Sequence, residues 1–506
     1  PLKWHALYKI PFWCNIPSNS CETRTNTALA IMRSKGFAVF LLACGGFAVY
    51  TAEPEFDSRF RRLCTVLLLA SAIAVALLHV WRKRLALRDW LARFAVLVFA
   101  VLLFERYPLA HNHLLTNTNT WTPDSQWLVF DVRPSGASFT GETIERVNIH
   151  TGEVEVIYRA SQGAHVGVVT VHPKSDKYVF IHGPENPDET WHYDFHHRRG
   201  VIAKGGKVSN LDAMDITAPY TPGALRGGSH VHVFSPDGER VSFTYNDHVM
   251  HQLDSALDLR NVGVAAPFGP VNVQKQHPRE YSGSHWCVLV SKTTPTPQPG
   301  SDEINRAYEE GWVGNHALAF IGDTLSPKGE KVPELFIVEL PQDEAGWKAA
   351  GDAPLSGTET TLPAPPRGVV QRRLTFTHHR AYPGLVNVPR HWVRCNPQGT
   401  QIAFLMRDDN GIVQLWLISP QGGEPRQLTH NKTDIQSAFN WHPSGEWLGF
   451  VLDNRIACAH AQSGEVEYLT ENHANPPSAD AVVFSPDGQW LAWMEGGQLW
   501  ITETDR

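Results

Sequence analysis

Histidines are the residues of this chain whose types and positions point most directly to chemistry. The sequence has 506 residues and 25 histidines. Five of them stand near the expected start of a strand that faces a shared axis: His165, His230, His232, His285 and His391. Gln436 and Asp480 hold comparable places further along the chain. Neutral imidazole binds transition metals such as Mn, Fe, Zn and Ni, and histidine is also a common general base. The alternative is that these rings bond to each other, to water or to backbone carbonyls.

Four arginines lie close in sequence to the same strand starts. They are Arg226, Arg279, Arg380 and Arg394. A guanidinium group binds a carboxylate through two parallel hydrogen bonds, so these residues are candidates for holding an acidic ligand. The alternative is that they are solvated or anchor loops.

A repeated ten-residue segment must position these side chains. Every copy has proline at its third place and an aromatic residue at its tenth. The copies are residues 121–130, 171–180, 234–243, 395–404, 441–450 and 484–493. An apolar residue, a tight turn of the Pro-Asp-Gly type and a run of alternating apolar residues are typical of a β-hairpin.

The spacing of the hairpins predicts an all-β fold, a β-propeller. Units that recur about every 40 to 60 residues in a strand-rich chain are typical of propeller blades. We expect seven blades, with six or eight as alternatives because residues 261–273 are hard to place. One blade would combine residues 284–290 as inner strand with residues 316–321, 334–339 and 370–375.

The ends of this region predict how the ring closes. The last hairpin is followed by one more strand, residues 498–502, so the final blade lacks an outer strand. Residues 113–116 contain the Leu-Thr pair that ends the fourth strand of other blades. We therefore expect this N-terminal strand to pair with the last blade, which removes an open sheet edge.

The first 110 residues differ in composition from the rest. Residues 1–31 form an undefined leader, and residues 32–110 contain apolar runs at 36–52, 63–81 and 90–104 that predict one to three membrane helices. Three spans and the positive-inside rule put the propeller, residues 111–506, in the periplasm, anchored to the inner membrane. Without a third span, or if this region is not native, the propeller is cytoplasmic. A signal peptide at residues 32–52 is a further alternative.

Charge and motifs exclude several classes of protein. The formal net charge of -7 and the absence of a basic tail argue against nucleic-acid binding. The chain has neither the Gly-x-x-x-x-Gly-Lys-Ser/Thr phosphate loop nor the Gly-x-Ser-x-Gly nucleophile elbow. Its seven cysteines show no framework spacing, and those in strand-like runs are expected to be buried thiols.

Two resemblances follow from these residues. The hairpins resemble those of TolB-type propellers, and residues 111–506 as a whole resemble the enterobacterial YidR family. Residues 178–191, 228–230 and 282–285 are similar, in order and context, to oligogalacturonate lyases. Those lyases are seven-bladed propellers with a catalytic histidine in the channel and a Mn ion held by three histidines and a glutamine.

The second resemblance implies roles for particular residues. His230 matches the catalytic histidine, His285 the first metal ligand, and His391 lies near the remaining ligands. Residues 387–393 depart from the pattern, with one histidine and no glutamine at the matching offset. Substrate contacts would then come from the other polar residues expected at the channel: His165, His182, Arg226, His232 and Gln436.

The implied reaction is β-elimination from an acidic oligosaccharide. A base removes the proton at C5 of a uronate while a cation, Mn being the expected metal, stabilises the charge on the carboxylate. The alternative function is a propeller scaffold without catalysis that binds a protein or glycan partner, because a fold alone does not choose between these classes.

Overall fold

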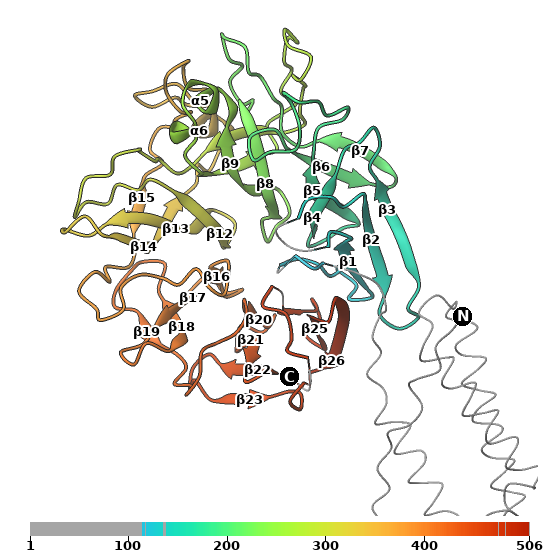
Figure 1. Cartoon of the computed structure of the whole chain (residues 1–506), viewed down its shortest axis with the longest axis vertical. Coiled ribbons are helices and arrows are strands. Elements are labelled where there is room, and N and C mark those ends of the chain that lie inside the picture. The colour runs from blue at the N-terminus through green and yellow to red at the C-terminus, as the bar shows by residue number, and fades with distance from the viewer. Residues whose placement is uncertain (1–113, 117, 135–137, 474, 481, 505) are drawn as a thin grey trace, which may run out of the picture. The chain divides into compact units, whose positions relative to one another are not determined.

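A computed structural model describes residues 114–506 of the chain, except residues 117, 135–137, 474, 481 and 505. In this part the chain forms seven antiparallel sheets arranged as the blades of a propeller around one axis (Figure 1). The predicted all-β, seven-bladed fold is confirmed. The expected leader and membrane helices, residues 1–110, lie outside the described residues. Within the described residues, no helix is long and apolar enough to cross a bilayer.

The blades follow the chain order around the ring. Blade 1 contains β1 (Trp127–Asp131), β2 (Thr143–Asn148) and β3 (Val154–Arg159). Blade 2 contains β4 (Val166–Val171), β5 (Lys177–His182), β6 (Arg199–Lys204) and β7 (Lys207–Asn210). Blade 3 contains β8 (Gly227–Phe234), β9 (Val241–Asp247), β10 (Asn261–Ala266) and β11 (Trp286–Leu289). Blade 4 contains β12 (Ala307–Val313), β13 (Ala317–Leu325), β14 (Lys331–Glu339) and β15 (Gln371–Arg373).

The remaining blades are smaller. Blade 5 contains β16 (Arg394–Cys395), β17 (Ile402–Arg407), β18 (Val413–Ile418) and β19 (Arg426–Gln427). Blade 6 contains β20 (Asn440–Trp441), β21 (Trp447–Leu452), β22 (Arg455–His460) and β23 (Val466–Tyr468). Blade 7 contains β24 (Val482–Phe484), β25 (Trp490–Glu495) and β26 (Gln498–Glu503). In the described part of the chain, three short helices lie in loops: α5 (His248–Leu253), η1 (Ser255–Leu257) and α6 (Glu344–Lys348).

The repeated hairpins have the turn chemistry that their sequences predict. In the turn between β8 and β9, Ser235 Oγ donates to Asp237 Oδ1 at 2.5 Å, and Gly238 has a φ of +83°. The turn between β24 and β25 repeats this with Ser485, Asp487 and a glycine of positive φ. Glycine adopts this left-handed backbone without steric cost, which is why the motif recurs from blade to blade.

One predicted blade was wrong in its strand assignment. Residues 284–290 were expected to form an inner strand, but β11 is the outermost strand of blade 3 and pairs with β10. The inner strand of blade 4 is instead β12. Residues 284–290 are apolar enough for any position in a sheet, and alternation of side chains does not encode distance from the axis. As a result His285 precedes an outer strand.

The N-terminal segment closes the ring in a form that differs from the predicted pairing. Leu114 forms an antiparallel bridge with Asp131 at the end of β1, rather than with β26. Contact with blade 7 comes from Leu115, whose backbone N–H lies 3.2 Å from Met494 Sδ, and from Trp121, whose indole donates to the Val483 carbonyl. Leu114, Leu115 and Trp121 share one apolar cluster with residues of blades 1 and 7. The segment therefore joins the first blade to the last by packing.

The inner strands of blades 2, 3 and 4 share an irregularity. In β4, β8 and β12 the register shifts by a bulge before the strand ends. Each bulge contains a residue other than glycine with positive φ: Val168 at 55°, Val231 at 54° and Glu309 at 53°. This conformation costs an L-residue about 1–2 kcal/mol and is rare for a β-branched side chain. Bulges of this kind redirect side chains and are frequent next to functional sites.

A cationic central cavity beside a histidine cluster

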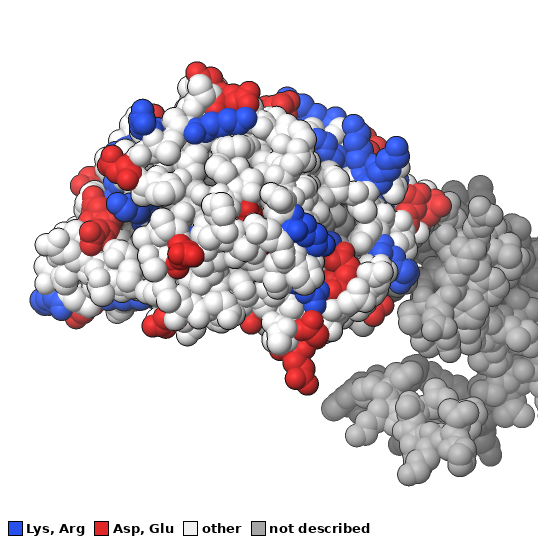
Figure 2. All heavy atoms as spheres, turned by 90° about the horizontal axis from the view of Figure 1, so that it is seen from above, with Lys and Arg blue, Asp and Glu red and all other residues white. Residues whose placement is uncertain are grey.

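A cavity of about 590 Å³ lies at the centre of the ring. All three bulge residues, Val168, Val231 and Glu309, line it, together with Leu114 and Thr116 from the closing segment. On the side of the molecule seen in Figure 2, acidic and basic side chains are interspersed.

Five arginines line this cavity, and two of them are neutralised. Arg133 Nε lies 2.7 Å from Asp131 Oδ1, and Arg390 Nε lies 2.8 Å from Glu309 Oε1. The other three are Arg198, Arg260 and Arg306. Among the described residues, none of these three has a carboxylate within salt-bridge distance. The cavity thus has more cationic than anionic groups.

Arg198 is the most buried of the three unpaired arginines. Its side chain is 4% exposed, and its Nη1 donates to Tyr193 Oη at 2.8 Å. Its Nε and Nη2 have no hydrogen-bond partner among the described residues. Burial lowers the pKa of Arg198. Burial, with repulsion from Arg198 and Arg306, lowers the pKa of Arg260 to about 10. An anion in the cavity would stabilise the charged forms of Arg198 and Arg260 and so raise both pKa values.

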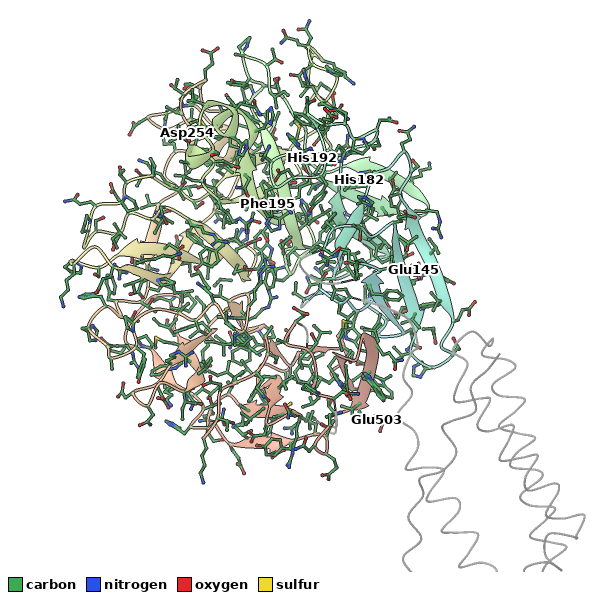
Figure 3. The ribbon with its side chains drawn as sticks, viewed as in Figure 1. Glu145, His182, His192, Phe195, Asp254 and Glu503 are labelled. Carbon is green, nitrogen blue, oxygen red and sulfur yellow. The ribbon has the colours of Figure 1, made fainter. Side chains whose placement is uncertain are left out.

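Aromatic rings form part of the cavity wall. Phe195, labelled toward the centre of the ring in Figure 3, is 54% exposed, and the guanidinium carbons of Arg198 and Arg260 lie 4.9 and 5.5 Å from its centroid. Tyr193 stacks on Phe139 at 4.0 Å, and Arg306 lies 4.4 Å from the ring of Tyr308. Exposed aromatic faces beside guanidinium groups suit a ligand that has both rings and negative charge.

His230, the expected catalytic residue, reaches the cavity from β8. It is 6% exposed, and its Nε2 has no hydrogen-bond partner among the described residues. Burial, and then the positive charges of Arg198 and Arg260, hold the pKa of His230 well below its usual value. The imidazole is therefore neutral at neutral pH, with a lone pair that can accept a proton.

His391 also lines the cavity, but both of its ring nitrogens face backbone groups. The N–H of Leu405 donates to His391 Nε2 at 3.2 Å, and His391 Nδ1 faces the Pro389 carbonyl at 3.3 Å. Because a carbonyl only accepts, the proton is on Nδ1 and the Nε2 lone pair is already engaged. Burial lowers the pKa of His391 to about 4.

The other histidines singled out from the sequence are absent from the cavity wall. His182 Nδ1 donates to the Gly183 carbonyl at 2.6 Å and its Nε2 accepts from Tyr158. His232 is fully buried against Ser229, which its Nε2 meets at 2.9 Å. His165 precedes β4 and has a buried Nδ1 without a hydrogen-bond partner in the described chain. His285 bonds to Ser284 beside the outer strand β11.

Two further candidates have structural partners outside the cavity wall. Arg226 is fully buried, lies 2.7 Å from Asp247 Oδ2 and donates to the Thr361 carbonyl at 3.0 Å. Gln436 is exposed and exchanges hydrogen bonds with Asn454. Of the set expected at the axis, the structure brings His230, His391 and Asp480 to the cavity.

The three arginines without carboxylate partners were not predicted as site residues, although a pattern in the sequence could have identified them. Arg198, Arg260 and Arg306 each stand immediately before a strand, namely β6, β10 and β12. The arginines that were considered, at 226, 279, 380 and 394, were chosen by closeness to presumed inner strands. Closeness in sequence is a weak guide, because a loop residue reaches the axis only if the strand beside it is correctly placed in its blade.

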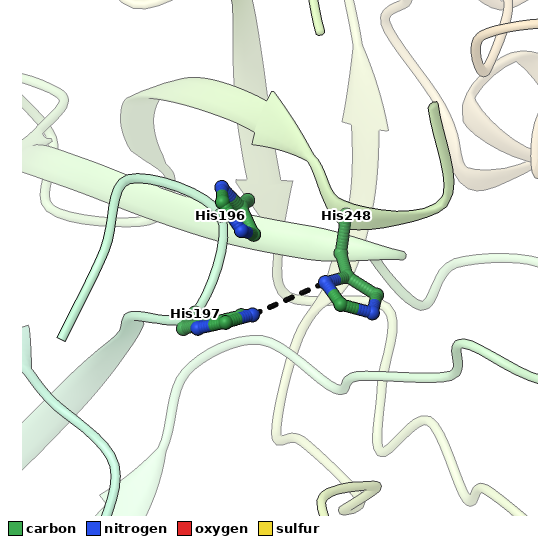
Figure 4. A group of neighbouring side chains, drawn as sticks. All are labelled: His196, His197 and His248. Atoms are coloured by element: carbon green, nitrogen blue, oxygen red, sulfur yellow. Dashed lines mark hydrogen bonds between the residues drawn. The ribbon is translucent and has the colours of Figure 1, made fainter. Parts of the chain in front are cut away.

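A histidine cluster beside the cavity was also missed. His196, His197 and His248 offer ligand atoms that all lie within 4.8 Å of one another (Figure 4), and His196, His251 and Asp258 form a second such group. Burial lowers the pKa values of His196 and His248 to about 4 and about 3, so the rings are neutral. Neutral imidazoles at this spacing can hold a metal ion. The signals in the sequence are the adjacent pair 196 and 197 and the pair 248 and 251, three residues apart.

The chain is similar in sequence or in structure to several known proteins. Residues 165–281 match the family described as "Protein of unknown function (DUF3748)". Among solved structures, an oligogalacturonate lyase in complex with manganese aligns with 79% of this chain and 93% of its own, at 9% identity and a TM-score of 0.48. A putative TolB from Agrobacterium tumefaciens aligns with 73% of this chain and all of its own, at 14% identity and a TM-score of 0.38.

A curated relative is far more similar in sequence. The "Uncharacterized protein YidR" of Escherichia coli (strain K12) is 98% identical over 395 residues, which cover 78% of this chain and 95% of that protein. The "Uncharacterized peptidase YuxL" of Bacillus subtilis (strain 168) is 25% identical over 152 residues, or 22% of each chain. By its near-identity over almost the whole of the Escherichia coli protein, this chain belongs to the YidR family.

Proposed function

We propose that the central cavity binds an acidic oligosaccharide and that His230 acts there as the base of a β-elimination. The observation that carries the proposal is the group of three arginines without carboxylate partners around a neutral histidine. Arg198, Arg260 and Arg306 supply positive charge that the described protein does not balance. A buried or half-buried cation without a partner is costly, and a ligand carboxylate would offset that cost.

The aromatic wall supports a sugar over a simple inorganic anion. Phosphate or sulfate would use the arginines and leave Phe195 in water, where half of its surface now lies. A pyranose ring has apolar C–H faces that pack on an aromatic ring, while its carboxylate accepts from guanidinium groups. A cavity of about 590 Å³ is within the range of pockets for small ligands, roughly 300–1,000 Å³.

The residues present can carry each step of an elimination. His230 takes the proton from C5 of a uronate, the electron pair becomes the C4–C5 double bond, and the C4–O bond breaks. The guanidinium groups hold the carboxylate on which negative charge develops. Tyr193 Oη accepts from Arg198, so its own O–H is free to protonate the departing oxygen. Burial raises the pKa of Tyr193, which keeps that proton in place.

The Mn ion implied by the resemblance does not fit the residues expected to hold it. His285 stands beside the outer strand of blade 3, and the His391 Nε2 lone pair accepts from Leu405. These residues do not form one donor set, so the arginines take the place of the metal in the proposed reaction.

Binding and turnover can be measured separately with oligogalacturonate. We expect calorimetry to show binding and the ultraviolet absorbance of an unsaturated uronate to rise with time. His230→Gln should retain binding and lose about 10²–10⁴-fold of the rate, the usual contribution of a general base. Arg198→Met should lose binding. Arg426→Met is the matched control, since Arg426 bonds to the carbonyls of Ala461 and Gln462 at the edge of blade 5.

A second candidate function is binding without catalysis. The observation in its favour is the low pKa of His230, because a weakly basic imidazole is a poor proton acceptor until a bound anion raises its basicity. Stoichiometric binding of oligogalacturonate without any gain in absorbance would support this function and contradict the lyase. Absence of binding would overturn both.

A further inference from the structure

We infer that His196, His197 and His248 form a binding site for one divalent transition-metal ion, of the Zn²⁺, Co²⁺ or Ni²⁺ type. The ion would fasten the loop of residues 191–198 to the start of α5. This inference goes beyond the proposed function and does not depend on it, since it concerns a site beside the central cavity.

The spacing of the three rings suits an ion after a small contraction. Their ligand atoms lie within 4.8 Å of one another, and His197 Nε2 is 3.1 Å from His248 Nδ1 (Figure 4). Around a tetrahedral ion with bonds of about 2.0–2.1 Å, nitrogen ligands lie roughly 3.4 Å apart. Side-chain movements of about an ångström would therefore complete the coordination, with water as a fourth ligand.

His197 is held in the orientation and tautomer that a metal ligand needs. Its Nδ1 lies 2.9 Å from the carbonyl oxygen of His192, and a carbonyl only accepts, so the proton is on Nδ1. The lone pair is consequently on Nε2, which faces His248. Trp191 stacks on the ring at 3.8 Å and an interplanar angle of 19°. A backbone partner on the far nitrogen is the common outer contact of metal-binding histidines.

His248 is placed by a rigid anchor below it. Asp247 caps α5 by accepting from the N–H of Met250 at 2.9 Å, and its other oxygen binds Arg226. The N–H of His248 itself donates to the Arg226 carbonyl at 3.0 Å. Arg226, expected to bind substrate, is thus a positioning residue for this histidine. Fixed backbone on both sides reduces the entropy that binding an ion would cost.

His196 has a buried nitrogen that faces a carboxylate and lacks a hydrogen-bond partner among the described residues. It is 3% exposed, yet its Nδ1 has no hydrogen-bond partner among the described residues. That Nδ1 lies 3.8 Å from Asp258 Oδ2, while Asp258 Oδ1 is fixed by the N–H of Asp247 at 2.6 Å. A carboxylate that faces the far nitrogen of a ligating histidine is a usual outer contact in zinc sites. Closing this gap would give His196 its missing partner.

The donors define the class of metal. Three imidazole nitrogens favour Zn²⁺, Co²⁺, Ni²⁺ or Cu²⁺ over Mg²⁺ and Ca²⁺, which prefer oxygen. Two of the three ligands, His196 and His197, belong to the loop that supplies the cavity with Tyr193, Phe195 and Arg198. An ion bound at His196 and His197 would fix the backbone between Phe195 and Arg198. Removing it should then loosen the cationic wall of the cavity.

The test is a titration of the whole protein with Co²⁺ and Zn²⁺ after treatment with a chelator. We expect one ion per chain at micromolar concentration or below, with visible absorption bands of Co²⁺ bound to nitrogen, displaced by Zn²⁺. His197→Ala and His248→Ala should each weaken binding by at least about 100-fold. His192→Ala is the matched control, since His192 is an exposed neighbour that contributes its backbone carbonyl. It should bind as the unmodified protein does.

Two results would overturn the inference. One is the absence of stoichiometric binding by the unmodified protein, which needs no variant and so does not depend on whether a variant folds. The other is binding that survives His197→Ala and disappears in His285→Ala, which would place the ion at the residue implied by the resemblance to lyases. Failure of oligogalacturonate to bind would leave the metal titration unchanged, so the two proposals fail separately.

Discussion

Blades 2 to 4 and blades 5 to 7 are built from the same hairpin but differ at the axis. The inner strands β4, β8 and β12 have six to eight residues, and each is bulged with a residue of positive φ. The inner strands β16, β20 and β24 have two or three residues, and none has positive φ. The three unpaired arginines and the histidine cluster all belong to the first half.

The two halves of the ring differ in role. Blades 5 to 7 stabilise the ring, and blades 2 to 4 supply the residues that face a ligand. In blades 5 and 6 the apolar residues of β17, β18, β21 and β22 interlock in one cluster, with short loops between them. Blades 3 and 4 are interrupted by long segments, residues 248–260 and 340–370, and the first of these ends at the cavity residue Arg260. The regular blades therefore stabilise the ring, and the irregular blades contain the candidate site.

Replacing one phenylalanine in each half is the strongest way to break this comparison. Phe450 in β21 is fully buried, and Phe195 at the cavity is 54% exposed. Phe450→Ala should reduce the free energy of unfolding by about 3–5 kcal/mol through lost burial and the cavity left behind. Phe195→Ala should change it by less than about 0.5 kcal/mol and weaken oligogalacturonate binding. Denaturant unfolding and calorimetry measure the two effects. Equal losses of stability would show that the cavity wall is part of the core.

The regular half is also the part that the sequence predicted well. The Pro-Asp-Gly turns, the aromatic residue at the tenth place and the fourth-strand Leu-Thr pair are local signals, and they located β16 to β26 correctly. In blade 4 the second, third and fourth strands were located, but the inner strand was not, because the segment between Phe243 and Cys395 contains strands without the turn motif. Nothing in residues 284–290 distinguishes an outer strand from an inner one, since that choice depends on pairing with β10 across an insertion.

The candidate site was predicted only where it depends on a correctly placed inner strand. His230 lies on β8 directly before its hairpin, and it reaches the cavity as expected. Arg226, four residues earlier, instead forms a buried ion pair with Asp247. The sequence did not predict this pair, because Asp247 lies 21 residues further along the chain. The cluster of His196, His197 and His248 joins a loop of blade 2 to a helix of blade 3. Spacing along the chain does not reveal such contacts.

A matched pair of arginines tests whether binding depends on the charge at the cavity or on general surface charge. Arg260→Met should weaken oligogalacturonate binding by about 10- to 100-fold, because a hydrogen bond to a charged partner is worth about 1.5–3 kcal/mol. The effect should shrink as salt is added, since ions screen the remaining arginines. Arg372→Met is the control: its guanidinium donates to the carbonyls of Pro420 and Gln421 on blade 5. Similar losses in both variants would indicate binding by general surface charge.

His182 provides a smaller test, through pH, of a histidine that the first half uses for structure. Burial, and then Arg199, lower its pKa to about 4, whereas the unfolded chain has the usual value near 6.5. The unfolded state therefore takes up a proton between these values, and stability present above pH 6.5 is lost as the pH falls toward 4. His182→Asn should reduce that loss by about 1–2 kcal/mol at pH 5. Unfolding at several pH values measures it, with the exposed His430→Asn as control.

The bulges allow the finest comparison of the two halves. In an ordinary strand, glycine is less stable than alanine by about 0.5–1 kcal/mol, because it loses more backbone entropy on folding. At Val168, whose φ is 55°, the order should reverse, since glycine adopts this conformation freely and alanine does not. We therefore expect Val168→Gly to be more stable than Val168→Ala by about 1 kcal/mol, as measured by denaturant unfolding.

Val483 in β24 is the matched position in the regular half, a buried valine on an inner strand without a bulge. There Val483→Ala should be the more stable variant, by about 0.5–1 kcal/mol. Comparing glycine with alanine at one position removes the lost valine methyl groups from both sides, so the sign of the difference reports the backbone alone. If Val168 and Val483 gave the same sign, the inner strands of blades 2 to 4 would hold no strain, and the bulges would not mark the site.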